Sequence, residues 1–177
     1  MSEMQISSVR GMDVNMDLEM GRIGWDDYFM AIAWAVSRRA DCTRRMVGAL
    51  LVESTSNRII GSGYNGAPSK SAESCLDGGC PRGLRSNDEI APGSAYDGSV
   101  EGGRCIAVHA EANALLHSFR GIPSVAGTMY VTTEPCPDCW KLMAAGGVIR
   151  VVWSEWIGMR FQRVERMWTD GAWKVRE

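Results

Sequence analysis

Residues 26–39 carry apolar side chains at spacings of three and four, which predicts a helix with one face in the core. That face comprises Phe29, Ile32, Ala33 and Val36. Residues 47–52 form a continuous apolar run, which is typical of a strand covered on both faces. A polar turn at 54–57 separates this run from a second predicted strand at 58–64.

The second half of the chain continues to alternate between helical and strand-like patterns. Apolar residues at helical spacing predict helices at 108–120, 137–145 and 159–168. Short apolar runs predict further strands at 128–132, 148–153 and 173–175. No internal repeat or boundary interrupts the pattern, so we expect one α/β domain over residues 1–177.

Two segments lack a clear apolar period. Residues 1–24 are rich in Met, Asp, Ser and Gly, which predicts a flexible N-terminal arm. Residues 65–104, dominated by Gly, Ser, Pro, Asp and Arg, form a long predicted insertion loop. Such a loop inside a compact domain needs a source of order. Cys75 and Cys80 within it, with Cys105 beside it, make a zinc ion one candidate.

Composition narrows the class of protein. Of 177 residues, 45% are hydrophobic and 23% are charged, as is ordinary for a soluble globular protein. No apolar run approaches the ~20 residues of a membrane span, and the start lacks a signal-peptide pattern. We therefore expect a cytoplasmic protein without a membrane partner, in which six cysteines favour metal over disulfides. The net charge of −2 disfavours a nucleic acid polymer and favours a small anionic substrate.

The strongest chemical signal is a set of possible zinc ligands. His109, Cys136 and Cys139 offer one imidazole and two thiolates, which can bind zinc and leave its fourth position for water. Glu111 follows two residues after the histidine and is left free to move protons. The spacing H-x-E followed by P-C-x-x-C is the signature of zinc deaminases. The chain has only two histidines, so this match is not selected from many candidates.

Two other interpretations of these ligands stay open. A closed structural zinc site could take Cys105 or His117 as its fourth ligand, but it would not need Glu111 at this offset. The two cysteines could form a redox pair, but the sequence around Pro137 and Asp138 lacks a thioredoxin-like βαβ start.

Four segments within about residues 26–155 resemble the deoxycytidylate (dCMP) deaminase family of the cytidine deaminase superfamily. They are CTRRMVGA at 42–49, GSGYNGAP at 61–68, CIAVHAEANA at 105–114, and MYVT with PCPDC within 129–139. The resemblance implies a cytidine deaminase-like fold, a three-layer α-β-α arrangement around a central mixed five-stranded sheet. It also implies Zn²⁺-dependent hydrolytic deamination of dCMP to dUMP, with release of ammonia, in pyrimidine deoxynucleotide metabolism.

The resemblance extends to regulation and assembly. It implies a homo-oligomer, in the family often a hexamer, with dCTP as an activator and dTTP as an inhibitor. Mg²⁺ would accompany a dCTP regulator.

Individual residues receive roles in the same way. Glu111 is the expected catalytic residue, and Asn65 is expected to hydrogen-bond the deoxyribose. Arg44 is the candidate for the phosphate, and Ala110 and Glu134 are assigned to the substrate site. As alternatives, Asn65 simply caps a turn and Arg44 is an ordinary solvated arginine.

A second, structural zinc is a further expectation. Some family members hold a second zinc near the insertion, partly on cysteines that match Cys42 and Cys75. The four cysteines left here as possible ligands are Cys42, Cys75, Cys80 and Cys105. The family's histidine and glutamate ligands have no counterpart, since Ser99 and Ala107 stand in their places. Free buried thiols are the alternative.

Two departures from the family pattern widen the choice of substrate. Glu134 precedes Pro135, as in many guanine and tRNA adenosine deaminases, so a tRNA adenosine or free-base deaminase is an alternative. Residues 153–157 replace a tyrosine-bearing stretch, which suggests a pocket for a 5-substituted cytosine such as 5-methyl-dCMP, with a dTMP-type product. A catalytically silent zinc-binding assembly module is the non-enzymatic alternative, against which the intact Glu111 argues.

Overall fold

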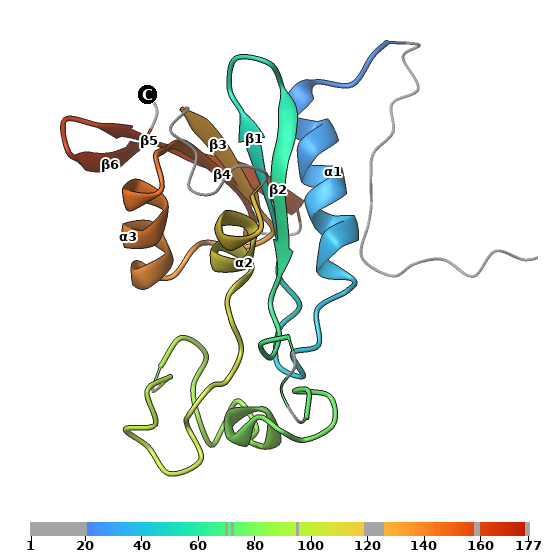
Figure 1. Ribbon diagram of the computed structural model, residues 1–177, viewed down its shortest axis with the longest axis vertical. Coiled ribbons are helices and arrows are strands. Elements are labelled where there is room, and N and C mark those ends of the chain that lie inside the picture. Colours follow the sequence, from blue (N-terminus) through green and yellow to red (C-terminus); the bar gives the residue numbers. More distant parts are fainter. Residues whose placement is uncertain are drawn as a thin grey trace, which may run out of the picture.

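A mixed sheet with helices on both faces forms the body of the protein (Figure 1). The computed structural model describes residues 21–69, 71, 73–94, 96–118, 126–157 and 160–175, without the side chains of 155–161. Most of the predicted arm at 1–24 lies outside these residues, as does the end of the predicted helix at 108–120. None of the described helices is long and apolar enough to cross a membrane.

The elements follow one another along the chain much as the sequence predicts. The helices are α1 (Trp25–Ser37), the 3-10 helix η1 (Pro81–Leu84), α2 (Ala110–Leu116) and α3 (Pro137–Ala145). The strands are β1 (Gly48–Glu53), β2 (Arg58–Tyr64), β3 (Gly127–Val131), β4 (Val148–Ile157), β5 (Arg160–Thr169) and β6 (Ala172–Val175). Their order in the sheet is β2-β1-β3-β4-β5-β6. Among the neighbouring strands of the described sheet, only β3 and β4 are parallel, and α3 forms the crossover between them.

The predicted helix at 159–168 is wrong, because β5 occupies that stretch. The described sheet therefore has six strands and not the five that the resemblance implies, while the α/β class is confirmed. Alternate residues of β5 serve different faces: Arg163 and Glu165 form ion pairs on the α1 side, whereas Arg166 packs over tryptophan rings on the α3 side. Charged residues on both faces hide the two-residue period of the strand.

Side chains of the central strands pack into two separate hydrophobic cores, one on each face of the sheet. On β1, Ala49 and Leu51 pack with α2 and α3, whereas Leu50 and Val52 pack against α1. This alternation confirms that the apolar run at 47–52 is a strand covered on both faces. Burial of each large aliphatic side chain here contributes roughly 1.5–3 kcal/mol, so the two cores fix both helical layers to the sheet.

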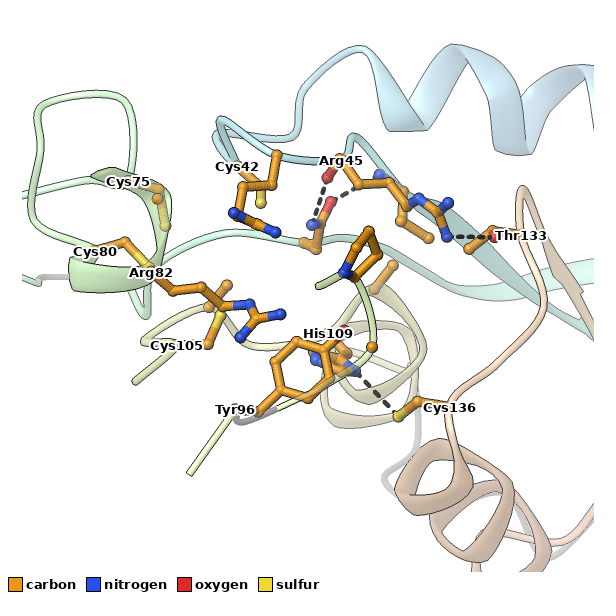
Figure 2. A pocket seen from close by; sticks show the side chains of 18 of the residues that line it. Cys42, Arg45, Cys75, Cys80, Arg82, Tyr96, Cys105, His109, Thr133 and Cys136 are labelled. Carbon is orange, nitrogen blue, oxygen red and sulfur yellow. Dashed lines mark hydrogen bonds between the residues drawn. The ribbon is translucent and has the colours of Figure 1, made fainter. Parts of the chain in front are cut away.

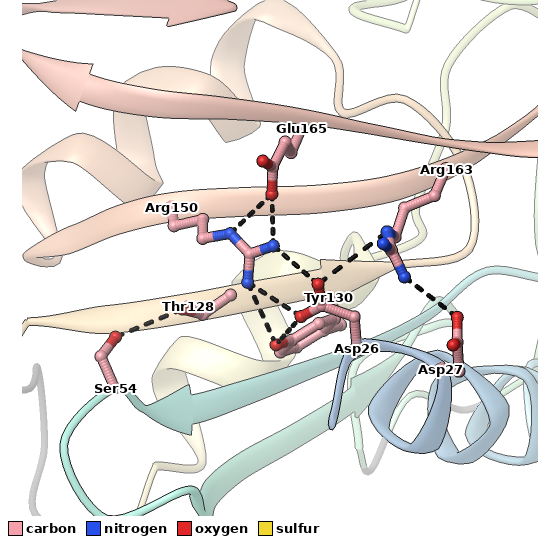
Figure 3. Close-up of polar contacts among 8 residues, drawn as sticks. All are labelled: Asp26, Asp27, Ser54, Thr128, Tyr130, Arg150, Arg163 and Glu165. Carbon is pink, nitrogen blue, oxygen red and sulfur yellow. Dashed lines mark hydrogen bonds and ion pairs between the residues drawn. The ribbon is translucent and has the colours of Figure 1, made fainter. Parts of the chain in front are cut away.

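A polar network ties α1 to the far strands across the sheet (Figure 3). Both Nη atoms of Arg150 donate to the carboxylate of Asp26, at 2.9 and 2.8 Å, and Nε donates to Glu165 at 2.7 Å. The hydroxyl of Tyr130 donates to the same Asp26 carboxylate at 2.7 Å. These contacts, with Arg150 as the largest cause, lower the pKa of Asp26 to about 2. The network is therefore charged under all ordinary conditions.

We expect Asp26→Asn to lower the free energy of unfolding by about 1–2 kcal/mol at pH 7, because it removes one partner of a partly buried ion pair. The folded pKa of about 2 lies below the ordinary value of 3.8, so this contribution is complete above that value. It is lost as the pH falls through the folded pKa. Urea unfolding between pH 7 and pH 2 should show wild type and variant converging at the acid end.

The exposed neighbour Asp27, which pairs with Arg163, supplies the matched control. Asp27→Asn should change the free energy of unfolding by less than about 0.5 kcal/mol. A deficit of Asp26→Asn that is equally large at pH 2 and pH 7 would show that charge is not the cause.

Candidate metal centre and catalytic cavity

The predicted zinc ligands meet where the amino ends of α2 and α3 converge. His109 is the residue that precedes the first turn of α2, and Cys136 holds the same position at α3. Pro137 opens α3 at a position where a missing amide hydrogen costs nothing. Cys139 lies in the first turn of α3 and is buried. The two helices therefore bring the imidazole and both thiols to one place.

The geometry of these three side chains fits zinc. The Nδ1 atom of His109 lies 3.4 Å from the Sγ atoms of both Cys136 and Cys139, and Figure 2 shows the first contact. Bond lengths of about 2.3 Å to sulfur and 2.0–2.1 Å to nitrogen place such atoms about 3.6 Å apart around a tetrahedral ion. Among the described residues, this is the group of ligand atoms that lie within 4.8 Å of one another. Three ligands leave one position of a tetrahedral ion for a reactant.

The electrostatics of the group favour metal binding. Hydrogen bonds from Cys139 and then from His109 lower the pKa of the Cys136 thiol to about 4. The same contact with Cys136, together with burial, raises the pKa of Cys139. These contacts favour the thiolate form of Cys136, and the amino ends of both helices add partial positive charge. A divalent cation would displace the proton of the Cys139 thiol.

Glu111 stands beside the ligands without being one of them. The residue is 4% exposed and its carboxyl group contacts the thiol of Cys139, but the carboxyl oxygens are not part of the compact ligand group. Burial is the largest cause that raises the pKa of Glu111 above its ordinary value. A raised pKa makes the carboxyl group a better proton acceptor, as a general acid and base requires.

A cavity of about 400 Å³ opens in front of this group. Its walls come from the segment before β1, the end of β2, the insertion, and the starts of α2 and α3. The predicted site residues that line it are Arg44, Asn65, His109, Ala110, Glu111, Glu134 and Cys136. The structure therefore brings almost every predicted site residue to one cavity.

The polar groups of Asn65 and Arg44 already have partners in the protein. The Asn65 amide accepts from the backbone N–H of Val47 at 2.7 Å and donates to the carbonyl of Arg45 at 2.8 Å. Arg44 donates to three carbonyls of the insertion, those of Arg85, Ser86 and Ile90. These contacts favour a role for Arg44 in holding the insertion against β1. Its contact with phosphate stays a prediction.

Glu134 and Ala110 both line the cavity. Ala110 is fully buried at the start of α2, between His109 and Glu111. Glu134 is half exposed and lies 3.8 Å from Arg166 of β5. The substrate contacts expected of both residues stay predictions.

Two residues of the insertion that lie near His109 were not predicted from the sequence. The ring of Tyr96 meets the imidazole of His109 edge to face, at 5.6 Å between centroids. The guanidinium of Arg82 lies over the Tyr96 ring, 4.5 Å from its centroid. Both residues line the cavity. No periodic pattern marks either position, since η1 is a short helix and the rest of the described insertion has no helix or strand.

The four remaining cysteines also gather on the insertion side of the cavity (Figure 2). Cys75 and Cys80 are buried, while Cys42 and Cys105 are half-buried. Against the effect of burial, backbone N–H groups of Ile106, Gly83 and Arg82 lower the pKa of the Cys80 thiol. Their sulfur atoms do not form a group as compact as the His109 group.

A mixed sheet that presents one histidine, two cysteines and a buried glutamate at the amino ends of two helices defines the class of zinc-dependent deaminases. The family model for the cytidine and deoxycytidylate deaminase zinc-binding region matches residues 23–155, and the chain belongs to this family.

Known relatives agree with this assignment. The deoxycytidylate deaminase of Mycobacterium phage D29 is 47% identical over 136 residues, which cover 77% of this chain and 98% of the relative. That of Schizosaccharomyces pombe is 37% identical over 132 residues, covering 75% of this chain but 37% of the relative. The dCMP deaminase of cyanophage S-TIM5, solved with dCMP and dUMP, superposes with a TM-score of 0.52 at 28% identity. This match covers 72% of this chain and 78% of that one.

The position of His109 depends on a close contact between α2 and β2, which Gly63→Ala should disturb. A Cβ atom at Gly63 would lie 2.3 Å from the carbonyl oxygen of Ala110, so the start of α2 would have to move. We expect a loss of about 1–3 kcal/mol in the free energy of unfolding and weaker zinc retention. Urea unfolding and zinc content after dialysis against a chelator measure both effects.

Ser62→Ala, at an exposed position of the same strand, is the control and should leave both quantities unchanged. Full zinc content and unaltered unfolding in Gly63→Ala would contradict the dependence of the metal centre on this contact.

Proposed function

We propose that the protein hydrolyses dCMP to dUMP with release of ammonia. The observation that carries the proposal is the buried carboxyl group of Glu111, which lies beside the His109, Cys136 and Cys139 group in one cavity. The names of the relatives and the nucleotides bound to the cyanophage enzyme support the choice of substrate.

Glu111 carries the protons of the reaction. When bound, zinc would act as a Lewis acid that lowers the pKa of a water molecule to about 7. The Glu111 carboxylate takes a proton from the water that attacks C4 of cytosine and delivers it to N3 of the ring. Glu111 then takes the remaining proton from the hydroxyl group now on C4 and passes it to the amine, so that the C4–N4 bond breaks, the C4 carbonyl forms and ammonia leaves. The balance is dCMP and water on one side, dUMP and ammonia on the other.

The surrounding residues would orient the nucleotide. The small side chain of Ala110, between the zinc ligand and the proton carrier, leaves room for the pyrimidine ring. The Asn65 amide has a second N–H and a second lone pair beyond those engaged by the backbone, and these can serve the deoxyribose.

Glu111→Gln tests the assignment of the proton carrier. We expect ammonia release from dCMP to fall by about 10²–10⁴-fold, because the amide cannot accept the proton, while zinc content stays at the wild-type level. Glu101→Gln, an exposed change in the insertion, should leave turnover unchanged. Loss of zinc from Glu111→Gln would make Glu111 a metal ligand and overturn its role.

A substrate panel separates this function from the alternatives. Ammonia release should be fastest from dCMP within a set of CMP, dCTP, deoxycytidine, their 5-methyl forms, guanine and tRNA. Turnover of 5-methyl-dCMP no faster than background would remove the 5-substituted substrate, and a preference for guanine or tRNA would favour the deaminases suggested by Glu134. If the protein releases ammonia from none of these compounds, a catalytically silent zinc-binding assembly module would be the remaining interpretation.

The second, structural zinc is a separate proposal for Cys42, Cys75, Cys80 and Cys105. The three backbone N–H groups directed at the sulfur of Cys80 support it, since they stabilise a thiolate and four thiolates suit a closed tetrahedral site. Such an ion would hold the insertion in place as one wall of the cavity.

Metal analysis of the purified protein should then give about two zinc ions per chain. Cys80→Ser and Cys105→Ser should each reduce the count to about one and lower the melting temperature, because the insertion loses its ion. Ser99→Ala, in the same insertion, should keep both ions. A single zinc in the wild-type protein, unaffected by either cysteine change, would establish the alternative of free thiols.

Regulation and assembly follow from the family resemblance. We propose a cytoplasmic homo-oligomer, with a hexamer as the expected form, that dCTP activates together with Mg²⁺ and dTTP inhibits. Light scattering with and without each nucleotide would reveal an assembly of another size.

A further inference from the structure

Arg82 is a buried cation in the wall of the cavity. Only 2% of the residue is exposed, and its two Nη atoms donate to the carbonyls of Gly103 at 3.4 Å and Ala91 at 2.8 Å. In the described part of the chain, no carboxylate oxygen lies within 4.0 Å of this guanidinium. A buried charge without an opposite charge is costly, so the site is suited to an anion.

The side chain of Arg82 extends toward the metal centre. Figure 2 shows it running from the Cys80 side of the insertion toward Tyr96 and His109. Its guanidinium lies over the Tyr96 ring, and that ring meets the imidazole of His109. One aromatic side chain therefore separates the cation from a ligand of the candidate zinc.

The other two arginines of the cavity are less suited to this role. Three carbonyls of the insertion occupy the fork of Arg44. Arg45 is exposed and donates to the hydroxyl of Thr133 at 3.1 Å, so solvent screens its charge. Arg82 combines burial with free hydrogen-bonding capacity, because two contacts use two of the five N–H donors of a guanidinium.

We propose that Arg82 binds the 5′-phosphate of the substrate and thereby makes the site specific for a nucleoside monophosphate over the free nucleoside. The inference deepens the proposed deamination of dCMP and rests on it for the identity of the nucleotide. The phosphate supplies the missing anion and two or more acceptor oxygens, which match the planar guanidinium. Tyr96 holds the guanidinium at its depth in the cavity through the cation–π contact.

The sulfur cluster is the competing partner for this charge. If the charge of Arg82 balanced thiolates of the cysteines in the insertion, such as Cys80, removing the guanidinium would disturb the insertion. The affinities for the nucleotide and for the nucleoside would then fall together. A phosphate contact affects only the ligand that carries a phosphate. The ratio of the two affinities therefore distinguishes the two roles.

Equilibrium binding of dUMP and deoxyuridine, measured by calorimetry on the zinc-loaded protein, tests this inference without turnover. We expect Arg82→Gln to lower the affinity for dUMP by about 10- to 100-fold and to change the affinity for deoxyuridine by less than about 3-fold. Arg82→Lys, which keeps the charge but not the fork, should retain part of the preference for dUMP. Arg85→Gln, an exposed change in the same insertion, is the matched control and should behave as wild type.

Equal losses for both ligands, or no loss for dUMP, would overturn the role of Arg82. A wild-type protein that binds dUMP no more tightly than deoxyuridine would do the same. If the melting curve shows that Arg82→Gln does not fold, the ratio of the affinities of Arg82→Lys for dUMP and deoxyuridine provides the test. Normal dCMP turnover with an unchanged ratio would refute only this inference, whereas absent turnover with a changed ratio would refute only the proposed reaction.

Discussion

The amino ends of two separate helices have to meet, because the imidazole comes from α2 and the two thiols come from α3. The ligand atoms lie within 4.8 Å of one another, so small displacements of either helix would separate them. The sheet enforces the meeting: α2 packs on β1 and β2, and α3 forms the crossover between the parallel strands β3 and β4. A right-handed crossover places the start of its helix at the carboxyl end of the first strand, where ligand sites of α/β proteins form.

The central part of this arrangement could be predicted from the sequence because its signals are local. The apolar run at 47–52 is covered on both faces, and the H-x-E and P-C-x-x-C motifs fall at helix starts. A short motif with a fixed spacing implies its own geometry once the helix is known. For the same reason, the candidate ligands and Glu111 could be named before their surroundings were known.

The features that sequence reasoning missed all depend on partners far along the chain. The sequence of β5 does not show a strand pattern because charged residues lie on both of its faces. Partners on other elements neutralise some of these charges: Asp26 and Asp27 of α1 pair with Arg163, and Arg150 of β4 pairs with Glu165. Arg82 and Tyr96 lie in a segment without any period, and only the fold shows that they contact each other beside His109. Arg44 could be assigned to the cavity, but its three carbonyl partners in the insertion could not be foreseen.

The crossover between β3 and β4 has a consequence for the order in which the protein matures. Cys136 and Cys139 lie 27 and 30 residues after His109, and β3 separates them from it in the chain. A chain that leaves the ribosome amino end first exposes the histidine well before either thiol has emerged. The start of α3 gains its fixed place only when β4 is laid beside β3. Capture of the ion is therefore a late event in biosynthesis, and until then the nascent chain offers its sulfur atoms to oxidants and to competing metals.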